Sequence, residues 1–278
     1  MHRLSFEKLR LYNTGVKVPE CYYFIPKGDS EFFDKHRALC EAARDVCHLP
    51  TNVLAFERII PLPQDTRRLL IEKYCAPRIK PQAFSDPANK DCLVRVYLGS
   101  PEAGGRGMFF SLRNFKLHLK QMIELQLEVE AMASQMAETL AVMHWAARTD
   151  ARDVEFVLGS STMKLPLAAK SYSELIEMEP CSFTGPKSRT HEDFFHRKTE
   201  LWLLDFNQVR NITMDEEGVA QAVEATSIND PYFPKPFQGG MMARNLWDRF
   251  VKRYLSMASD ILKDEDSRIQ GIARTVYS

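Results

Sequence analysis

The sequence predicts a mixed α+β fold with a small strand-bearing N-terminal part and a larger, mainly helical C-terminal part. Short runs rich in β-branched and aromatic residues, bounded by prolines, occupy 16–26 and 53–60 and indicate strands. Apolar residues recur every three or four positions over 112–144 and again over 245–262, which indicates amphipathic helices. The composition, 45% hydrophobic and 27% charged, is that of a globular protein with one large core or two lobes that share a cleft.

The first half of the chain is predicted to alternate strands with short helices. Residues 31–47 mix apolar and charged side chains at helical spacing. Asp65 is placed to cap a short helix that ends before Pro77. The proline-bearing, polar stretch 78–91 is expected to be a loop, and 92–99 reads as a strand.

The second half adds two strands separated by a long connection. The amphipathic helix, or two helices in series, is followed by a polar loop at 147–153 and a short strand at 154–159. Residues 160–200 form a connection of a length that is usually functional or disordered. The nearly continuous apolar run 200–209 predicts a central strand, and the acids that open 215–230 favour a helix start.

The charge balance disfavours two classes of partner. Lys+Arg and Asp+Glu both number 37, so no global basic field exists to hold nucleic acid or an anionic membrane. No stretch approaches the roughly 20 apolar residues that cross a bilayer. The first residues have charges and no long apolar run, unlike a secretory signal. We therefore expect a cytoplasmic (or nuclear) protein that binds neither nucleic acid nor membrane.

The cysteines do not form a recognisable metal motif. None of the six belongs to a C-x-x-C pair. His36, Cys40, Cys47 and His48 are the one set that could be imagined around zinc, but their spacing matches no usual finger pattern. Reduced, mostly buried thiols are the better interpretation, and we expect no bound metal.

The order of elements after residue 112 resembles the catalytic centre of kinase-like phosphotransferases of the aminoglycoside and choline phosphotransferase type. In that resemblance Asp205, in the sequence Leu-Leu-Asp-Phe-Asn, stands for the metal-binding Asp. Asp153 stands where that fold usually has an Asn, and His144 for the histidine that ends the preceding helix. Arg148 occupies the position of the catalytic Asp, and Asp150 is the nearest acid that could replace it.

A resemblance at family level rests on ERIIPLP, FFSLRNF, LAVMHW, DARDVEFVLG and LWLLDFNQV. Together these motifs are similar to an uncharacterised fungal family whose members are often labelled zinc-finger-protein domains. The resemblance implies a degenerate kinase-like fold without the Gly-rich N-terminal part. Its reduced N-terminal lobe and hinge would span 1–63, and its helical C-terminal lobe would span 64–278, with 160–200 as an insertion.

Each candidate site residue has a structural alternative. The catalytic candidates are Asp150, Asp153, Glu155 and Asp205. The candidates for substrate contacts are Tyr22, Tyr23, His144, Trp145, Trp202 and Asn207. The loop acids could equally be turn residues, Asp205 a buried acid that holds its loop, and His144 a structural hydrogen-bond donor. Glu155 points either into the cleft beside Asp205 or outward into solvent.

These features lead to three functional hypotheses. The first is an enzyme or ligand-binding protein of fungal secondary metabolism, which acts on a small molecule by acid–base chemistry without ATP or other cofactor. Its ligand would lie in an inter-lobe cleft walled by Tyr22, Tyr23, Trp145 and Trp202. The second is a phosphotransferase that uses ATP and Mg²⁺. The third is a non-catalytic, pseudokinase-like interaction module in which 160–200 docks a protein partner.

Overall fold

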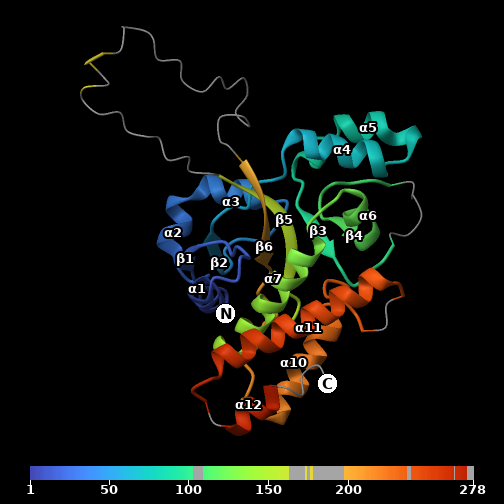
Figure 1. The fold of residues 1–278 in the computed structure, drawn as a ribbon. Helices are drawn as coiled ribbons and strands as arrows, with labels where there is room; N and C mark the ends of the chain where they lie inside the picture. The colour runs from blue at the N-terminus through green and yellow to red at the C-terminus, as the bar shows by residue number, and fades with distance from the viewer. Residues whose placement is uncertain are drawn as a thin grey trace.

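The computed structural model describes residues 1–102, 109–162, 197–236, 239–265 and 267–273, together with Ser173, Ile176 and Glu177. These residues combine helices with two small sheets (Figure 1), and the mixture of helices and strands that the sequence predicts is confirmed. One sheet pairs β1 (Cys21–Ile25) with β2 (Val53–Phe56), and the other has the strand order β4-β3-β5-β6.

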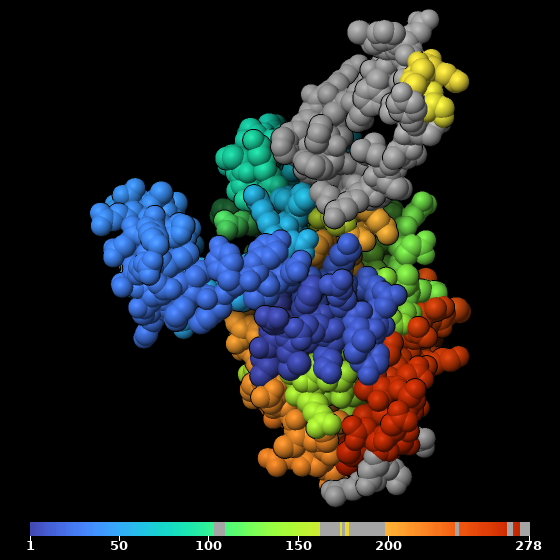
Figure 2. Space-filling view, turned by 90° about the vertical axis from the view of Figure 1, so that its left-hand side faces the viewer, coloured from blue at the N-terminus to red at the C-terminus, as the bar shows by residue number. Residues whose placement is uncertain are grey.

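The segment between β1 and β2 stands out from the body of the molecule. It carries α2 (Ser30–Lys35) and α3 (Arg37–Ala43), neither of which has a buried residue. Asp29 caps α2 by accepting a hydrogen bond from the backbone N–H of Phe32 at 2.9 Å. Figure 2 shows this part of the chain projecting to one side. The predicted helix 31–47 is thus confirmed as helical as far as Ala43, with a break between α2 and α3.

The four-stranded sheet forms the centre of the fold. Its members are β3 (Val94–Tyr97), β4 (Phe115–His118), β5 (Glu155–Thr162) and β6 (Arg197–Leu204). β5 and β6 form a full antiparallel ladder that begins with Glu155 opposite Leu204. β6 ends one residue before Asp205, so the predicted strand 200–209 is confirmed only in its first part. β3 pairs in parallel with β4.

The predicted loop at 78–91 is wrong, because its prolines begin helices. The segment contains η1 (Pro77–Ile79), α5 (Lys80–Ser85) and η2 (Pro87–Lys90), after α4 (Gln64–Tyr74). Each of the three short helices has proline in its first two positions. Proline is tolerated there because the first N–H groups of a helix have no intrahelical acceptor.

The long amphipathic stretch 112–144 is also divided differently from the prediction. Its first part is strand β4, and helices follow as α6 (Leu119–Glu124), α7 (Val129–Ala141) and the π-helical turn η3 (Val142–Ala146). Asn114 and Gln126, both with positive φ, lie at the breaks. Pairing with β3 therefore overrides the helical spacing of the first residues.

Helices build the other half of the core. α11 (Met241–Ile261) packs along α7, and its buried residues recur at helical spacing: Ala243, Leu246, Phe250, Tyr254 and Ala258. α10 (Glu216–Ile228) lies beside them, with α12 (Ser267–Ala273) at the end of the described chain (Figure 1). α1 (His2–Tyr12), which the sequence did not reveal, packs on η3. Among the described helices, none is long and apolar enough to cross a membrane.

Candidate functional site

Asp150 is an internal anchor of the acidic loop. Its side chain is fully buried. One carboxylate oxygen accepts from the backbone N–H groups of Arg152 and Arg210, and the other from Arg210 Nε at 2.7 Å and Gln221 Nε2 at 3.0 Å. Burial alone would raise the pKa of Asp150, but these hydrogen bonds together hold it below the ordinary value. Both carboxylate oxygens are thus occupied by donors within the protein, and Asp150 does not line the cavity described below.

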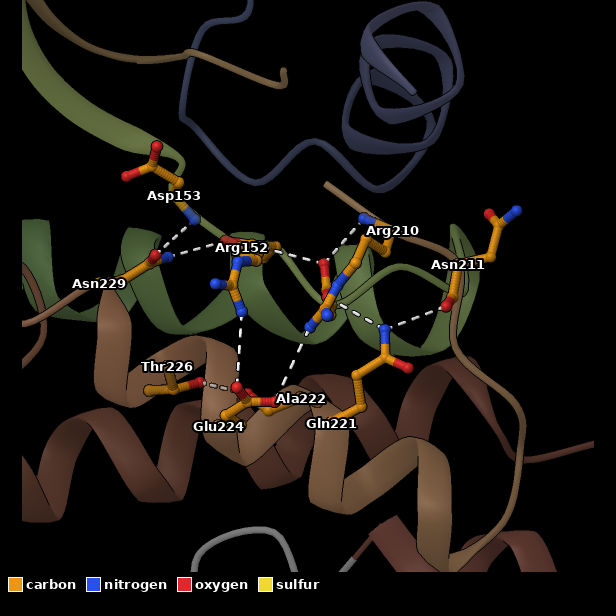
Figure 3. A network of polar contacts seen from close by, with 11 residues as sticks. Arg152, Asp153, Arg210, Asn211, Gln221, Ala222, Glu224, Thr226 and Asn229 are labelled. Atoms are coloured by element: carbon orange, nitrogen blue, oxygen red, sulfur yellow. Dashed lines mark hydrogen bonds and ion pairs between the residues drawn. The ribbon is translucent and has the colours of Figure 1, made fainter. Parts of the chain in front are cut away.

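Helix α10 clamps the same loop from a second direction. Asn229, which is buried, accepts from the backbone N–H of Asp153 at 2.6 Å and donates to the carbonyl of Ala151 at 2.7 Å. Arg152 and Arg210 both lie near the carboxylate of Glu224. Figure 3 shows Gln221, Glu224 and Asn229 reaching from α10 toward the loop.

The clamped segment holds an unusual backbone. Arg148, Ala151 and Asp153 have φ between 53° and 60°, and Asp205 has φ 65°. The left-handed conformation costs a non-glycine residue about 1–2 kcal/mol. Residues in this conformation gather at functional sites, where surrounding contacts hold the backbone in place. The hydrogen bonds of Asp150 and Asn229 supply that enforcement for the loop.

Three of the predicted acids share one electrostatic environment. Glu155 begins β5 opposite the end of β6, so it lies beside Asp205. Its carboxylate forms an ion pair with Arg95 at 2.6 Å, with both side chains largely buried. Burial raises the pKa of Glu155 against the effect of Arg95, and the charges of Asp205 and Asp153 raise it further. Glu155 thus points toward Arg95 and Asp205 instead of outward into solvent.

Asp205 is a perturbed acid for the same reasons. Burial, followed by the negative charge of Asp153, raises the pKa of Asp205 above its ordinary value, while Arg95 opposes the change. Asp153 is half-buried and accepts a hydrogen bond from Gln208. Arg95 was missed at the sequence level. The available signal was a single charge inside the apolar strand VRVY.

A large cavity opens on one side of Asp205. Its volume is about 1190 Å³, and α1, β1, β2 and the residues after β6 contribute to its wall. Asp205, Asn207, Tyr22 and Tyr23 all line it, so four of the predicted site residues meet there. The wall is strongly aromatic: it includes His2, Tyr22, Tyr23, Phe24, Phe56 and Phe206.

His2 ties the N-terminal helix to this cavity. Its ring stacks on Phe206 at 4.8 Å between centroids and meets Phe56 edge-on at 5.6 Å. Nε2 lies 2.7 Å from the carbonyl oxygen of Pro19. Burial lowers the pKa of His2, so the neutral ring is favoured between the two phenyl groups. Sequence reasoning missed this residue because α1 itself was missed.

The expected walls formed by Trp145 and Trp202 are wrong. Both side chains are buried, and neither lines the cavity. Trp202 packs with Ile59 and Val157. Trp145 Nε1 donates to the Tyr254 hydroxyl, which also lies 2.8 Å from His144 Nδ1. Burial of a large aromatic ring is favourable, most so when an indole N–H finds a partner; Trp145 has one, whereas Trp202 Nε1 has none among the described residues.

His144 also lies in this interior cluster and does not line the cavity. Its side chain is about 1% exposed. Burial lowers its pKa to about 4, although the charge and backbone of Asp150 act in the opposite direction. The structural alternative therefore describes His144 better than ligand contact does.

A comparison with protein families finds a match to part of the chain. A family model described as "Zinc finger protein" matches residues 201–266, well under half of the chain. The matched range contains Asp205. It also contains Arg210, Gln221 and Asn229, which bind the acidic loop at 147–153. No curated protein and no solved structure matches the chain.

The residues do not fit a zinc ion, despite that description. Residues 201–266 contain neither cysteine nor histidine. Across the part of the chain that the structure describes, which includes His36, Cys40, Cys47 and His48, no group of three or more potential ligands is placed to hold a metal. Structural zinc is held mainly by thiolate and imidazole groups, and residues 201–266 offer neither.

Proposed function

We propose that this protein binds a small organic molecule in the cavity beside Asp205 and acts on it by acid–base chemistry. One observation carries the proposal: Asp205 both lines the cavity and has a raised pKa. An acid with a raised pKa keeps its proton closer to neutral pH, which suits proton transfer to or from a bound substrate. The negative charge of Asp153 acts together with burial to keep it raised.

The proposed scaffold is a degenerate kinase-like fold. Its support is the order α7, acidic loop, β5, β6 and Asp205-Phe206, with β5 and β6 as an antiparallel pair. We propose chemistry without ATP because Arg148 stands where that resemblance places the catalytic Asp. A role in fungal secondary metabolism is the setting that the family resemblance favours.

The test compares three proteins in a small-molecule extract: the wild type, Asp205→Asn and Asp248→Asn. Asp248 lies exposed on α11 and does not line the cavity, so its variant is the matched control. Mass spectrometry of the extract, and of molecules released on denaturation, should show a compound that the wild type and Asp248→Asn convert and Asp205→Asn does not. If the wild type neither retains nor changes any compound, the proposal fails.

A phosphotransferase is the second candidate. It is favoured by the effect of the Asp153 charge on Asp205, because the resemblance assigns these two acids to the metal site. Under this hypothesis millimolar ATP with Mg²⁺ raises the melting temperature of the wild type, because a ligand that binds only the native state stabilises it. The shift should vanish in Asp205→Asn. No shift in the wild type would rule this candidate out.

The interaction-module hypothesis depends on a protein partner of 160–200. Most of that segment lies outside the described residues, so the proposed contact gains no support here. Its prediction stands apart from the others: Asp205→Asn would leave partner binding intact.

A further inference from the structure

Four aromatic side chains that line the cavity are largely exposed and do not belong to the buried core. Tyr22, Tyr23 and Phe24 of β1 are each 56–59% exposed, and Phe56 of β2 is 48% exposed. All four line the same cavity. Clusters of exposed aromatic side chains mark binding surfaces, because a bound molecule can stack on the ring faces or pack against the ring edges and remove apolar surface from water. This wall therefore fits a ligand with aromatic rings.

The cavity wall also carries guanidinium groups. Arg58, two residues after β2, and Arg113, two residues before β4, line the cavity and are exposed. Arg58 has only a loose contact with Asp91 at 3.7 Å, both side chains being well exposed to water. Within the described residues, Arg113 has no acidic side chain in ion-pair range. Arg3, the third cavity arginine, is engaged by Glu7 at 3.0 Å.

The arginines of the cavity wall indicate that the ligand also carries an anionic group. Arg58 and Arg113 are open to a new acceptor, and guanidinium groups bind carboxylate, sulfonate and phosphate oxygens with paired N–H donors. Asp205 comes from the segment after β6 and is partly buried. In the same cavity the arginines offer partners for an anion, and the exposed side chains of β1 and β2 offer contacts for aromatic rings.

We propose that the cavity takes an aromatic molecule with one anionic group, its rings against β1 and β2 and its anion at Arg58 and Arg113. The inference rests on the small-molecule function proposed above and adds the ligand's chemical class. Asp205, the proposed acid, lines the same cavity.

Two fluorescent probes test the chemical class of the ligand separately from binding in the cavity as such. Anilinonaphthalene sulfonate has the proposed chemistry, and phenylnaphthylamine has the same rings without the anion. We expect the sulfonate to bind the wild type about tenfold more tightly, a difference typical of one charge-assisted contact. Arg113→Gln should remove most of this advantage and leave the neutral probe unchanged. Arg244→Gln, an exposed arginine on α11 outside the cavity, is the matched control.

Cysteine alkylation reports where the probe binds. Cys21 lines the cavity, whereas Cys47 is exposed outside it. Bound probe should slow alkylation of Cys21 and leave Cys47 unchanged, as measured by mass spectrometry of the labelled peptides.

The outcomes separate the two proposals. If neither probe binds or protects Cys21, both the small-molecule cavity and the ligand class fail. If both probes protect Cys21 with equal affinity, only the ligand class fails. Sulfonate binding that Arg113→Gln and Arg58→Gln leave unchanged, or that leaves Cys21 unprotected, also overturns the ligand class.

Discussion

Replacement of Asp150 by asparagine should destabilise the protein much more than the same replacement of Asp153. The new amide could still accept from the backbone N–H groups of Arg152 and Arg210, but its NH₂ would face two donors, Arg210 Nε and Gln221 Nε2. Removal of one partner from a buried ion pair costs about 3–5 kcal/mol. Because the Arg210 side chain is 45% exposed, we expect about 2–4 kcal/mol.

Asp153→Asn is the matched comparison within the same loop. Asp153 is half-buried, its backbone contact with Asn229 remains, and loss of its charge relieves repulsion with Asp205. We expect a change within about 1 kcal/mol in either direction. Urea denaturation measures both free energies of unfolding, and melting curves should show a drop of about 5–10 °C for Asp150→Asn alone. Equal stabilities, or a stable Asp150→Asn that loses activity, would refute the anchor role.

Three further predictions concern stability. Burial lowers the pKa of His144 to about 4, so below pH 6.5 the unfolded chain takes up a proton first. Stability should fall toward pH 4 by up to roughly 3 kcal/mol, and His144→Gln should flatten this part of the profile; an unchanged profile would contradict it. Asn229→Ala should cost about 2–4 kcal/mol in urea denaturation, because the buried carbonyl of Ala151 and the part-buried N–H of Asp153 lose their hydrogen bonds. The exposed control Asn245→Ala on α11 should be near neutral, and equal effects of the two variants would exclude the role of Asn229. Gly99→Ala should lower the melting temperature by several degrees because a Cβ would overlap backbone carbonyl oxygens, whereas Gly28→Ala has open space; similar melting temperatures would argue against the close contact.

Local patterns in the sequence predicted most elements of the fold. Strands 92–99 and 154–159 and helix 215–230 have patterns set by their own residues. The division of 112–144 depends on β3, which supplies a partner for Phe115–His118 from a distant segment. Prolines at 77, 81 and 87 have two opposite meanings, helix end and helix start, and only the folded chain distinguishes them.

The site was predictable only in part for the same physical reason. The order of elements indicated that Asp205 follows a strand and that it shares a cavity with aromatic residues of β1. The directions of side chains were not indicated: Trp145 and Trp202 face cores, and Asp150 faces Arg210. Their burial follows from contacts with distant elements that no local pattern encodes.

The central claim, that Asp205 is a perturbed acid on the wall of a ligand cavity, is tested most directly by its own titration. The carboxyl carbon of Asp205 can be followed by NMR with and without phenylnaphthylamine. We predict a pKa above the ordinary 3.8 in the free protein and a further rise when the probe displaces water from the cavity, because desolvation disfavours the charged form. A pKa at or below the ordinary value, or one that the bound probe leaves unchanged, would contradict the account.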